Sequence, residues 1–147
     1  MSLRERLNEE LKSAMKSKDS LKLSVIRMIR SSVKNREIEL HHELDEREII
    51  EIISTLGKQR RESIRLFREA DRQDLVDKEE KELGLLLEFL PQQLTREEIE
   101  ALVAKAIIDC GAQGSRDMGK VMKLLVSVVT GRADGKVVSE VVKEKLA

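Results

Sequence analysis

Apolar residues recur three and four positions apart along most of the chain, which is the spacing of one helix face and not the sustained alternation of a strand. In the N-terminal part, apolar stripes run over residues 3–15, 21–33, 49–67 and 83–90. Each stripe indicates one face of a helix that packs against a core. The pattern therefore predicts four helices and no sheet in this part of the chain.

Polar residues at the starts of these stripes support the helical assignment. Ser2 with Glu5 has the spacing of a capping box, and Asp45 with Glu48 opens the third helix. The segment 18–20 (KDS) ends the first helix and caps the second, and Asp74 is expected to cap the fourth.

Pro91 is the clearest boundary in the sequence. Proline cannot continue a helix, and it disfavours helical geometry at the residue before it. Beyond it, Thr95 and Glu98 form another capping box, and apolar stripes run over residues 99–107, 118–125 and 137–146. These stripes predict three further helices, which are shorter than the first four.

The turns between the last three helices have recognisable signals. Gly111 suits the end of the first of them, and Ser115 and Asp134 are expected to cap the other two. The sequence thus predicts an all-α chain in two domains. An N-terminal helical domain of about four helices (residues 1–90) is joined by a hinge (91–94) to a small three-helix tail domain (95–147).

Composition narrows the class of protein. The chain has 147 residues, of which 40% are hydrophobic and 38% charged, and its 28 basic and 28 acidic residues cancel. Net charge therefore gives no reason to expect a nucleic-acid or membrane partner, and only a local patch could recognise one. The single cysteine and the absence of a long apolar run lead us to expect a cytoplasmic protein without a signal peptide or a membrane span.

Residues that could carry catalysis or hold a metal are scarce. His41 and His42 are adjacent and point about 100° apart on a helix, and Glu37 with His41 supplies only half of a metal site. Cys110 lies at an apolar helix end and is expected to be a packed thiol. No glycine-rich loop has the spacing that cradles a phosphate. We therefore expect no catalytic residue, no metal, no cofactor and no enzymatic activity of the chain alone.

Charge is unevenly distributed along the chain. Residues 1–36 hold ten basic and four acidic residues, whereas residues 37–51 hold one basic and seven acidic. Arg27, Arg30 and Lys34 share one face of the second helix. A second basic ridge, about 20 Å long, follows the third helix. It consists of Lys58, Arg61, Arg65, Arg68 and Arg72.

Two interpretations of these ridges stay open. Rows of cations suit a phosphate backbone, because each neutralised phosphate releases counterions. However, Glu62 lies four residues from Lys58, and Glu69 lies four residues from Arg65. That spacing is typical of ion pairs on a solvated helix face, which is the interpretation that spacing alone favours.

The segment 131–136 (GRADGK) combines two glycines and two cations at the start of a helix. Backbone donors at a helix N-terminus favour an anion, and Arg132 and Lys136 add positive charge. Gly131 and Gly135 would let the backbone approach a partner closely. A plain helix connection capped by an aspartate explains most of the same residues. Two interpretations of this segment therefore stay open: an RNA or anion contact, and a simple turn. Lys120 and Lys123 on the preceding helix would complete the candidate RNA site.

Several segments, taken in order, resemble the GatB/YqeY family, and in particular its stand-alone YqeY-like members. The likeness runs from Leu3 to Leu146. It rests on residues 14–19 (AMKSKD), 23–29 (LSVIRMI), 58–64 (KQRRESI), 72–75 (RQDL), 88–94 (EFLPQQL), 118–122 (MGKVM), 131–136 (GRADGK) and 137–142 (VVSEVV).

The resemblance implies an all-helical fold with a C-terminal three-helix tail. A similar tail ends the GatB subunit of tRNA-dependent amidotransferases, where it helps to hold the misacylated tRNA. That complex is a carbon–nitrogen ligase that amidates Glu-tRNA(Gln) or Asp-tRNA(Asn) with glutamine as the amido donor. The family offers no established catalytic residue to transfer to this chain.

Three functions follow as expectations. The first is a tRNA-binding accessory protein that is not catalytic alone. The second is a helical interaction module that docks on an amidotransferase or an aminoacyl-tRNA synthetase. The third, an amidotransferase component with ligase activity, rests on the family resemblance only. The sequence leaves the oligomeric state open.

Overall fold

A computed structural model describes all 147 residues and confirms the all-α class, with seven α-helices, one short 3-10 turn and no strand. The chain forms two compact units, Met1–Pro91 and Gln92–Ala147. None of the helices is both long enough and apolar enough to cross a membrane.

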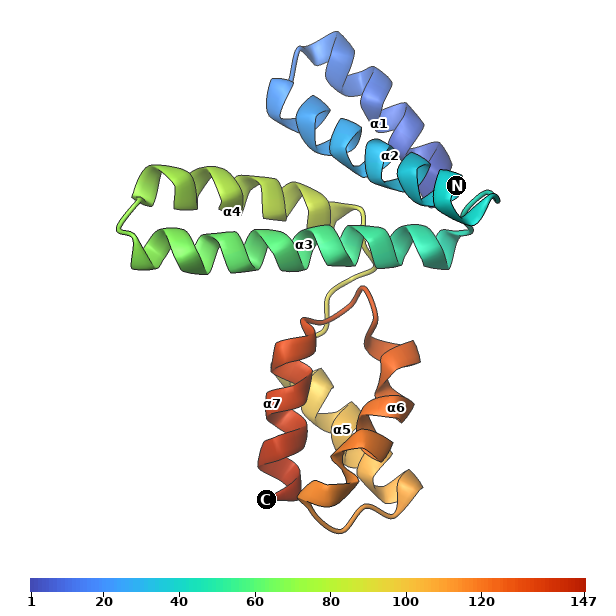
Figure 1. Ribbon diagram of the computed structural model, residues 1–147, viewed down its shortest axis with the longest axis vertical. Coiled ribbons are helices and arrows are strands. Elements are labelled where there is room, and N and C mark those ends of the chain that lie inside the picture. Colours follow the sequence, from blue (N-terminus) through green and yellow to red (C-terminus); the bar gives the residue numbers. More distant parts are fainter. The chain divides into compact units, whose positions relative to one another are not determined.

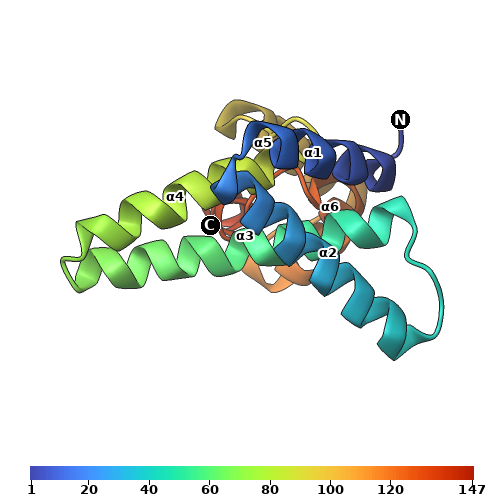
Figure 2. The ribbon, with the colours of Figure 1, turned by 90° about the horizontal axis from the view of Figure 1, so that it is seen from above.

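The first unit consists of two helical hairpins (Figure 1). Its helices are α1 (Leu3–Ser17), α2 (Ser20–Leu40), α3 (Glu46–Glu69) and α4 (Gln73–Glu88). Short connections make the helices of each hairpin antiparallel, and Figure 2 shows α3 and α4 running side by side. The two hairpins share one core. Its buried side chains are Leu3, Leu7, Ala14, Val25, Ile26, Ile29, Val33, Leu44, Ile49, Ile53, Leu56, Leu86 and Phe89.

Side-chain caps start most of these helices where the sequence predicts them. Ser2 and Asp45 each accept a hydrogen bond from the third residue of their helix and complete a capping box. Asp19 caps α2 by accepting from the backbone of Lys22. The prediction for Asp74 is wrong, because α4 begins one residue earlier, and the Asp74 carboxylate pairs with Arg72 at 3.0 Å.

The second unit is a three-helix bundle with its own core. Its helices are α5 (Arg96–Cys110), α6 (Met118–Val129) and α7 (Gly135–Leu146). Thr95 with Glu98 forms the predicted capping box of α5, and Gly111 ends that helix in the left-handed conformation with φ 66°. Ser115 does not cap α6, because residues Ser115–Asp117 form a 3-10 turn and α6 begins at Met118.

The residues after Pro91 are tied to the second unit. The Leu94 amide donates to the Arg132 carbonyl at 2.7 Å, and the Gln93 side-chain amide donates to the Gly131 carbonyl at 2.7 Å. The Arg132 guanidinium donates to the Gln92 carbonyl at 3.4 Å. Three residues of the expected hinge, Gln92, Gln93 and Leu94, therefore form hydrogen bonds with the loop between α6 and α7.

Candidate functional site

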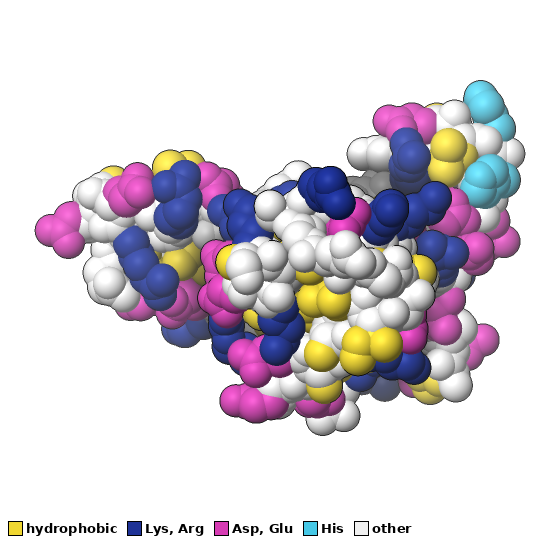
Figure 3. All heavy atoms as spheres, turned by 90° about the horizontal axis from the view of Figure 1, so that it is seen from below, with side chains coloured by type: hydrophobic (Ala, Val, Ile, Leu, Met, Phe, Trp, Pro, Cys, Tyr) yellow, Lys and Arg dark blue, Asp and Glu magenta, His cyan; other side chains and the backbone are white.

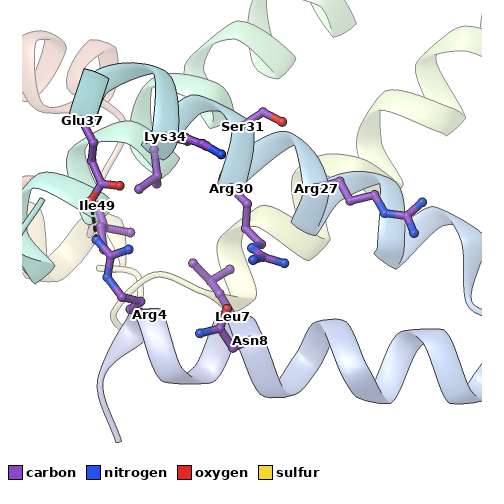
Figure 4. A pocket seen from close by; sticks show the side chains of 10 residues that line it. Arg4, Leu7, Asn8, Arg27, Arg30, Ser31, Lys34, Glu37 and Ile49 are labelled. Carbon is purple, nitrogen blue, oxygen red and sulfur yellow. Dashed lines mark hydrogen bonds and ion pairs between the residues drawn. The ribbon is translucent and has the colours of Figure 1, made fainter. Parts of the chain in front are cut away.

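A groove of about 580 Å³ runs between α1 and α2 (Figure 4). Its floor is apolar, because the side chains of Leu7, Val33 and Ile49 are buried there. Its rim is polar and carries four of the ten basic residues of positions 1–36. The rim residues are Arg4, Asn8, Arg27, Arg30, Ser31, Lys34 and Glu37.

Three cations of α2 are exposed on this rim. Arg27, Arg30 and Lys34 follow one another at helical spacing, and none of them forms an ion pair or a side-chain hydrogen bond. Figure 4 shows Arg30 pointing from α2 toward α1, above Leu7 and Asn8. Because no carboxylate neutralises them, these three charges are available to an anion from outside.

The opposite end of the groove is closed by a fixed ion pair. The Arg4 guanidinium donates to the Glu37 carboxylate at 2.7 Å and to the Leu44 carbonyl at 3.1 Å. The Leu44 amide donates to the same Glu37 oxygen at 2.8 Å. The Leu44 amide, followed by Arg4, lowers the pKa of the Glu37 carboxyl group, so this group stays ionised. The positive charge of the groove is therefore concentrated at Arg27, Arg30 and Lys34.

The sequence indicates the basic face of α2 but not the groove. The sequence does not show where α1 packs, and the α1 residues Arg4 and Asn8 form the second wall of the groove. The excess of basic residues over positions 1–36 was the available signal for this region.

The tail residues proposed for RNA lie in two places. Lys120 and Lys123 are exposed in the first half of α6, where Lys120 lies 3.8 Å from Asp117. The loop with Arg132 follows the last residue of α6, and Lys136 is exposed in the first turn of α7.

The loop residues also have clear structural roles. Arg132 is half-buried; its guanidinium donates to the Gln92 carbonyl, and its own carbonyl accepts from the Leu94 amide. Gly131 is buried with φ 77°, a conformation that side chains disfavour. Asp134 caps α7 by accepting from the Lys136 amide at 3.0 Å, whereas Gly135 is exposed with open space around its Cα. These contacts account for Gly131, Arg132 and Asp134 without a ligand.

The basic ridge of α3 is largely paired within the chain. Arg65 contacts Glu62 at 2.5 Å and Glu69 at 2.8 Å, and Arg68 pairs with Glu80 of α4. Arg72 pairs with Asp74, whereas Lys58 is exposed and Arg61 is half-buried. Figure 3 shows basic and acidic side chains interleaved along this hairpin. Such pairs leave less positive charge for a phosphate backbone than the groove does.

One buried polar cluster was not anticipated. Arg60 of α3 donates to Glu82 of α4 at 2.8 Å and lies 3.2 Å from Glu79, and its guanidinium contacts the sulfur of Met28 at 2.6 Å. Burial raises the pKa of Glu79, and the nearby charge of Glu82 adds to this effect. In the sequence, the only sign of this cluster is Glu82, a charged residue next to the leucines of α4. The cluster joins helices within the core of the first unit and does not face the groove.

Comparison with known proteins identifies the family. The sequence pattern described as Yqey-like protein matches residues 4–146, almost the whole chain. The chain belongs to the Yqey-like family. This confirms the resemblance that the sequence segments indicated.

Relatives of this Yqey-like chain occur in fungi. The protein named altered inheritance of mitochondria protein 41, mitochondrial, from Kluyveromyces lactis is 37% identical over 107 residues, which cover 70% of this chain and 57% of that protein. The protein of the same name from Pyrenophora tritici-repentis is 33% identical over 142 residues, covering 95% of this chain and 78% of the relative. The chain thus spans little more than half the length of the first of these relatives.

These names contradict the expectation of a cytoplasmic protein, because the relatives are named as mitochondrial proteins. The expectation relied on one cysteine and on the lack of an apolar span. Neither feature distinguishes one internal compartment from another, so this expectation was wrong.

Proposed function

We propose that this Yqey-like chain is an RNA-binding accessory protein whose α1–α2 groove contacts the phosphate backbone. The supporting observation is the row of three exposed cations, Arg27, Arg30 and Lys34, which have no partner within the chain. The cations of such a row replace counterions that are condensed on a phosphate backbone, so the affinity for RNA is highest at low salt. The apolar floor at Leu7 and Val33 lowers the local dielectric, which strengthens charge-assisted hydrogen bonds at the rim.

The family resemblance suggests tRNA as the RNA and an association with tRNA-dependent amidation. In this proposal the chain holds or presents the tRNA and performs no ligation alone. Lys120 and Lys123 are exposed and offer a separate contact on the tail. This contact is weaker, because it supplies only two positive charges. The α3 ridge contributes least, since Arg65, Arg68 and Arg72 are paired within the chain.

The test is a fluorescence anisotropy titration with labelled tRNA at two salt concentrations. The triple variant Arg27→Ala/Arg30→Ala/Lys34→Ala should bind at least about tenfold more weakly than the parent, since each charge-assisted contact is worth about 1.5–3 kcal/mol. The slope of log affinity against log salt should become shallower by about 0.7–0.9 for each phosphate that the variant no longer neutralises. Equal affinity of parent and variant would refute the proposal.

A matched control removes the same charge from the other unit. Lys105, Lys143 and Lys145 are exposed on α5 and α7, so their replacement by alanine changes the net charge equally. This control should retain most of the parent's affinity. A similar decrease in both variants would mean that only overall charge matters and that the groove is not a site.

The second candidate function is a protein-docking module. Leu124 and Val128 lie four residues apart on α6 and are 46% and 41% exposed, beside Lys120 and Lys123. An apolar interface there would keep its affinity as salt rises, whereas RNA affinity would fall steeply. Replacing Leu124 and Val128 with serine would weaken such a partner and leave tRNA affinity unchanged.

A further inference from the structure

We infer that the α1–α2 groove selects double-helical RNA over single-stranded RNA and over DNA. This inference rests on the proposed function, because it specifies the form of RNA that the same groove takes. Three features of the groove carry it: the regular positions of its cations on one helix, the location of the aromatic rings, and the polar side chains of its two walls.

The cations leave α2 at regular positions. Arg27, Arg30 and Lys34 belong to one continuous 21-residue helix, and their backbone positions extend over about 10 Å of its axis. A duplex already holds its phosphates in a regular row, so only the exposed cationic side chains have to be ordered when it binds. A single strand must be ordered first, and that cost is subtracted from its affinity.

Single-stranded RNA is usually gripped by rings on which its bases stack. The rings of this chain lie elsewhere. Phe89 is 3% exposed in the core, with the Arg6 guanidinium 5.1 Å above its ring, and Phe67 is half-buried on α3. His41 and His42 follow the end of α2 in the acidic segment 37–51, outside the groove lining. Unstacked bases would therefore gain little here, whereas a duplex keeps its bases stacked on one another.

Both walls of the groove carry an exposed group that can donate and accept hydrogen bonds. Asn8 on α1 and Ser31 on α2 both line the groove and are exposed. The ribose 2′-hydroxyl also donates and accepts, and A-form RNA displays it along a wide, shallow minor groove. DNA lacks this hydroxyl. Asn8 and Ser31 thus read the sugar, while the cations of α2 hold the phosphates.

The experiment compares three probes of one sequence with the full chain: an RNA duplex of about 16 base pairs, the corresponding DNA duplex and the single RNA strand. Fluorescence anisotropy should give at least about tenfold tighter binding of the RNA duplex than of either other probe. Arg27→Ala/Arg30→Ala/Lys34→Ala should weaken binding of all three probes. Asn8→Ala/Ser31→Ala should remove the preference for RNA duplex over DNA duplex and leave the salt slope unchanged.

The outcomes separate this inference from the function on which it rests. If the single strand binds as tightly as the duplex and the triple variant still binds more weakly than the parent, the selection of a duplex is wrong and RNA binding by the groove stands. If the DNA duplex binds as tightly as the RNA duplex, the reading of the 2′-hydroxyl is wrong. If the triple variant binds every probe as the parent does, the proposed function itself fails.

Discussion

The carboxylate of Glu37 lies 2.7 Å from the guanidinium of Arg4, and this pair joins the first turn of α1 to the last turns of α2. The same carboxylate accepts from the amide of Leu44, whose side chain is buried in the connection to α3. One side chain therefore holds three segments of the first unit and defines one end of the groove.

Replacing Glu37 with alanine should lower the melting temperature by several degrees. The substitution leaves the Leu44 amide without its acceptor and Arg4 without its principal partner. Glu39→Ala is the matched control, because Glu39 has the same charge on the same helix but pairs only with exposed Arg36. Thermal melts followed by circular dichroism compare the two variants. An equal effect of both would show that the Glu37 network does not hold the fold.

The same network predicts a pH dependence. The pKa of Glu37 is below its usual value of 4.5 in the folded chain, because the Leu44 amide and Arg4 stabilise the carboxylate. Its contribution to stability is therefore complete above about pH 4.5, the unfolded pKa, and is lost as pH falls through the folded pKa. Urea denaturation over this acidic range should show a steeper loss of stability for the parent than for Glu37→Gln. Parallel curves for the two proteins would contradict this assignment.

Most of the fold could be predicted because its signals are local. Helical periodicity and the residues around Ser2, Asp45 and Thr95 specify where helices begin, since each cap acts within three or four positions. The failures are local as well. Asp74 prefers an ion pair with Arg72 to a cap, and Ser115 enters a 3-10 turn before α6 begins.

The candidate site could be predicted only in part, because it depends on packing between elements. The basic face of α2 is visible from spacing, but the wall formed by Arg4 and Asn8 requires the antiparallel placement of α1. Charge counting also could not show that Arg68 pairs with Glu80 of another helix while Arg30 remains unpaired. The number of cations in a segment therefore says less about binding than which of them lack a partner.

The two glycines of the tail loop should respond differently to alanine. Gly131 has φ 77°, so Gly131→Ala should cost about 1–2 kcal/mol of stability. Gly135 begins α7 with nothing within 4 Å of an added Cβ, so Gly135→Ala should change stability by less than about 0.5 kcal/mol. Chemical denaturation measures both. If Gly135→Ala also weakens tRNA binding without affecting the melt, the loop touches RNA directly, contrary to its structural role here.

The buried cluster around Arg60 leads to a last pair of variants with opposite effects. Glu82 accepts the 2.8 Å hydrogen bond from Arg60, whereas the nearer oxygen of Glu79 is buried without a hydrogen bond. Glu82→Gln should therefore destabilise the chain by about 1–3 kcal/mol, because it removes the charged acceptor of a buried guanidinium. Glu79→Gln should raise the melting temperature at pH 7, because it removes a buried charge that repels Glu82.

The pH dependence of Glu79→Gln follows from the raised pKa of Glu79 in the folded chain. Protonation of Glu79 favours the folded state. The stabilisation that it provides is complete below the unfolded pKa of about 4.5 and is lost as pH rises through the folded pKa. The variant is neutral at every pH. Its advantage over the parent should therefore be largest at neutral pH and should vanish as the pH approaches 4.5. A variant that melts below the parent at pH 7 would show instead that the Glu79 charge is needed to balance Arg60.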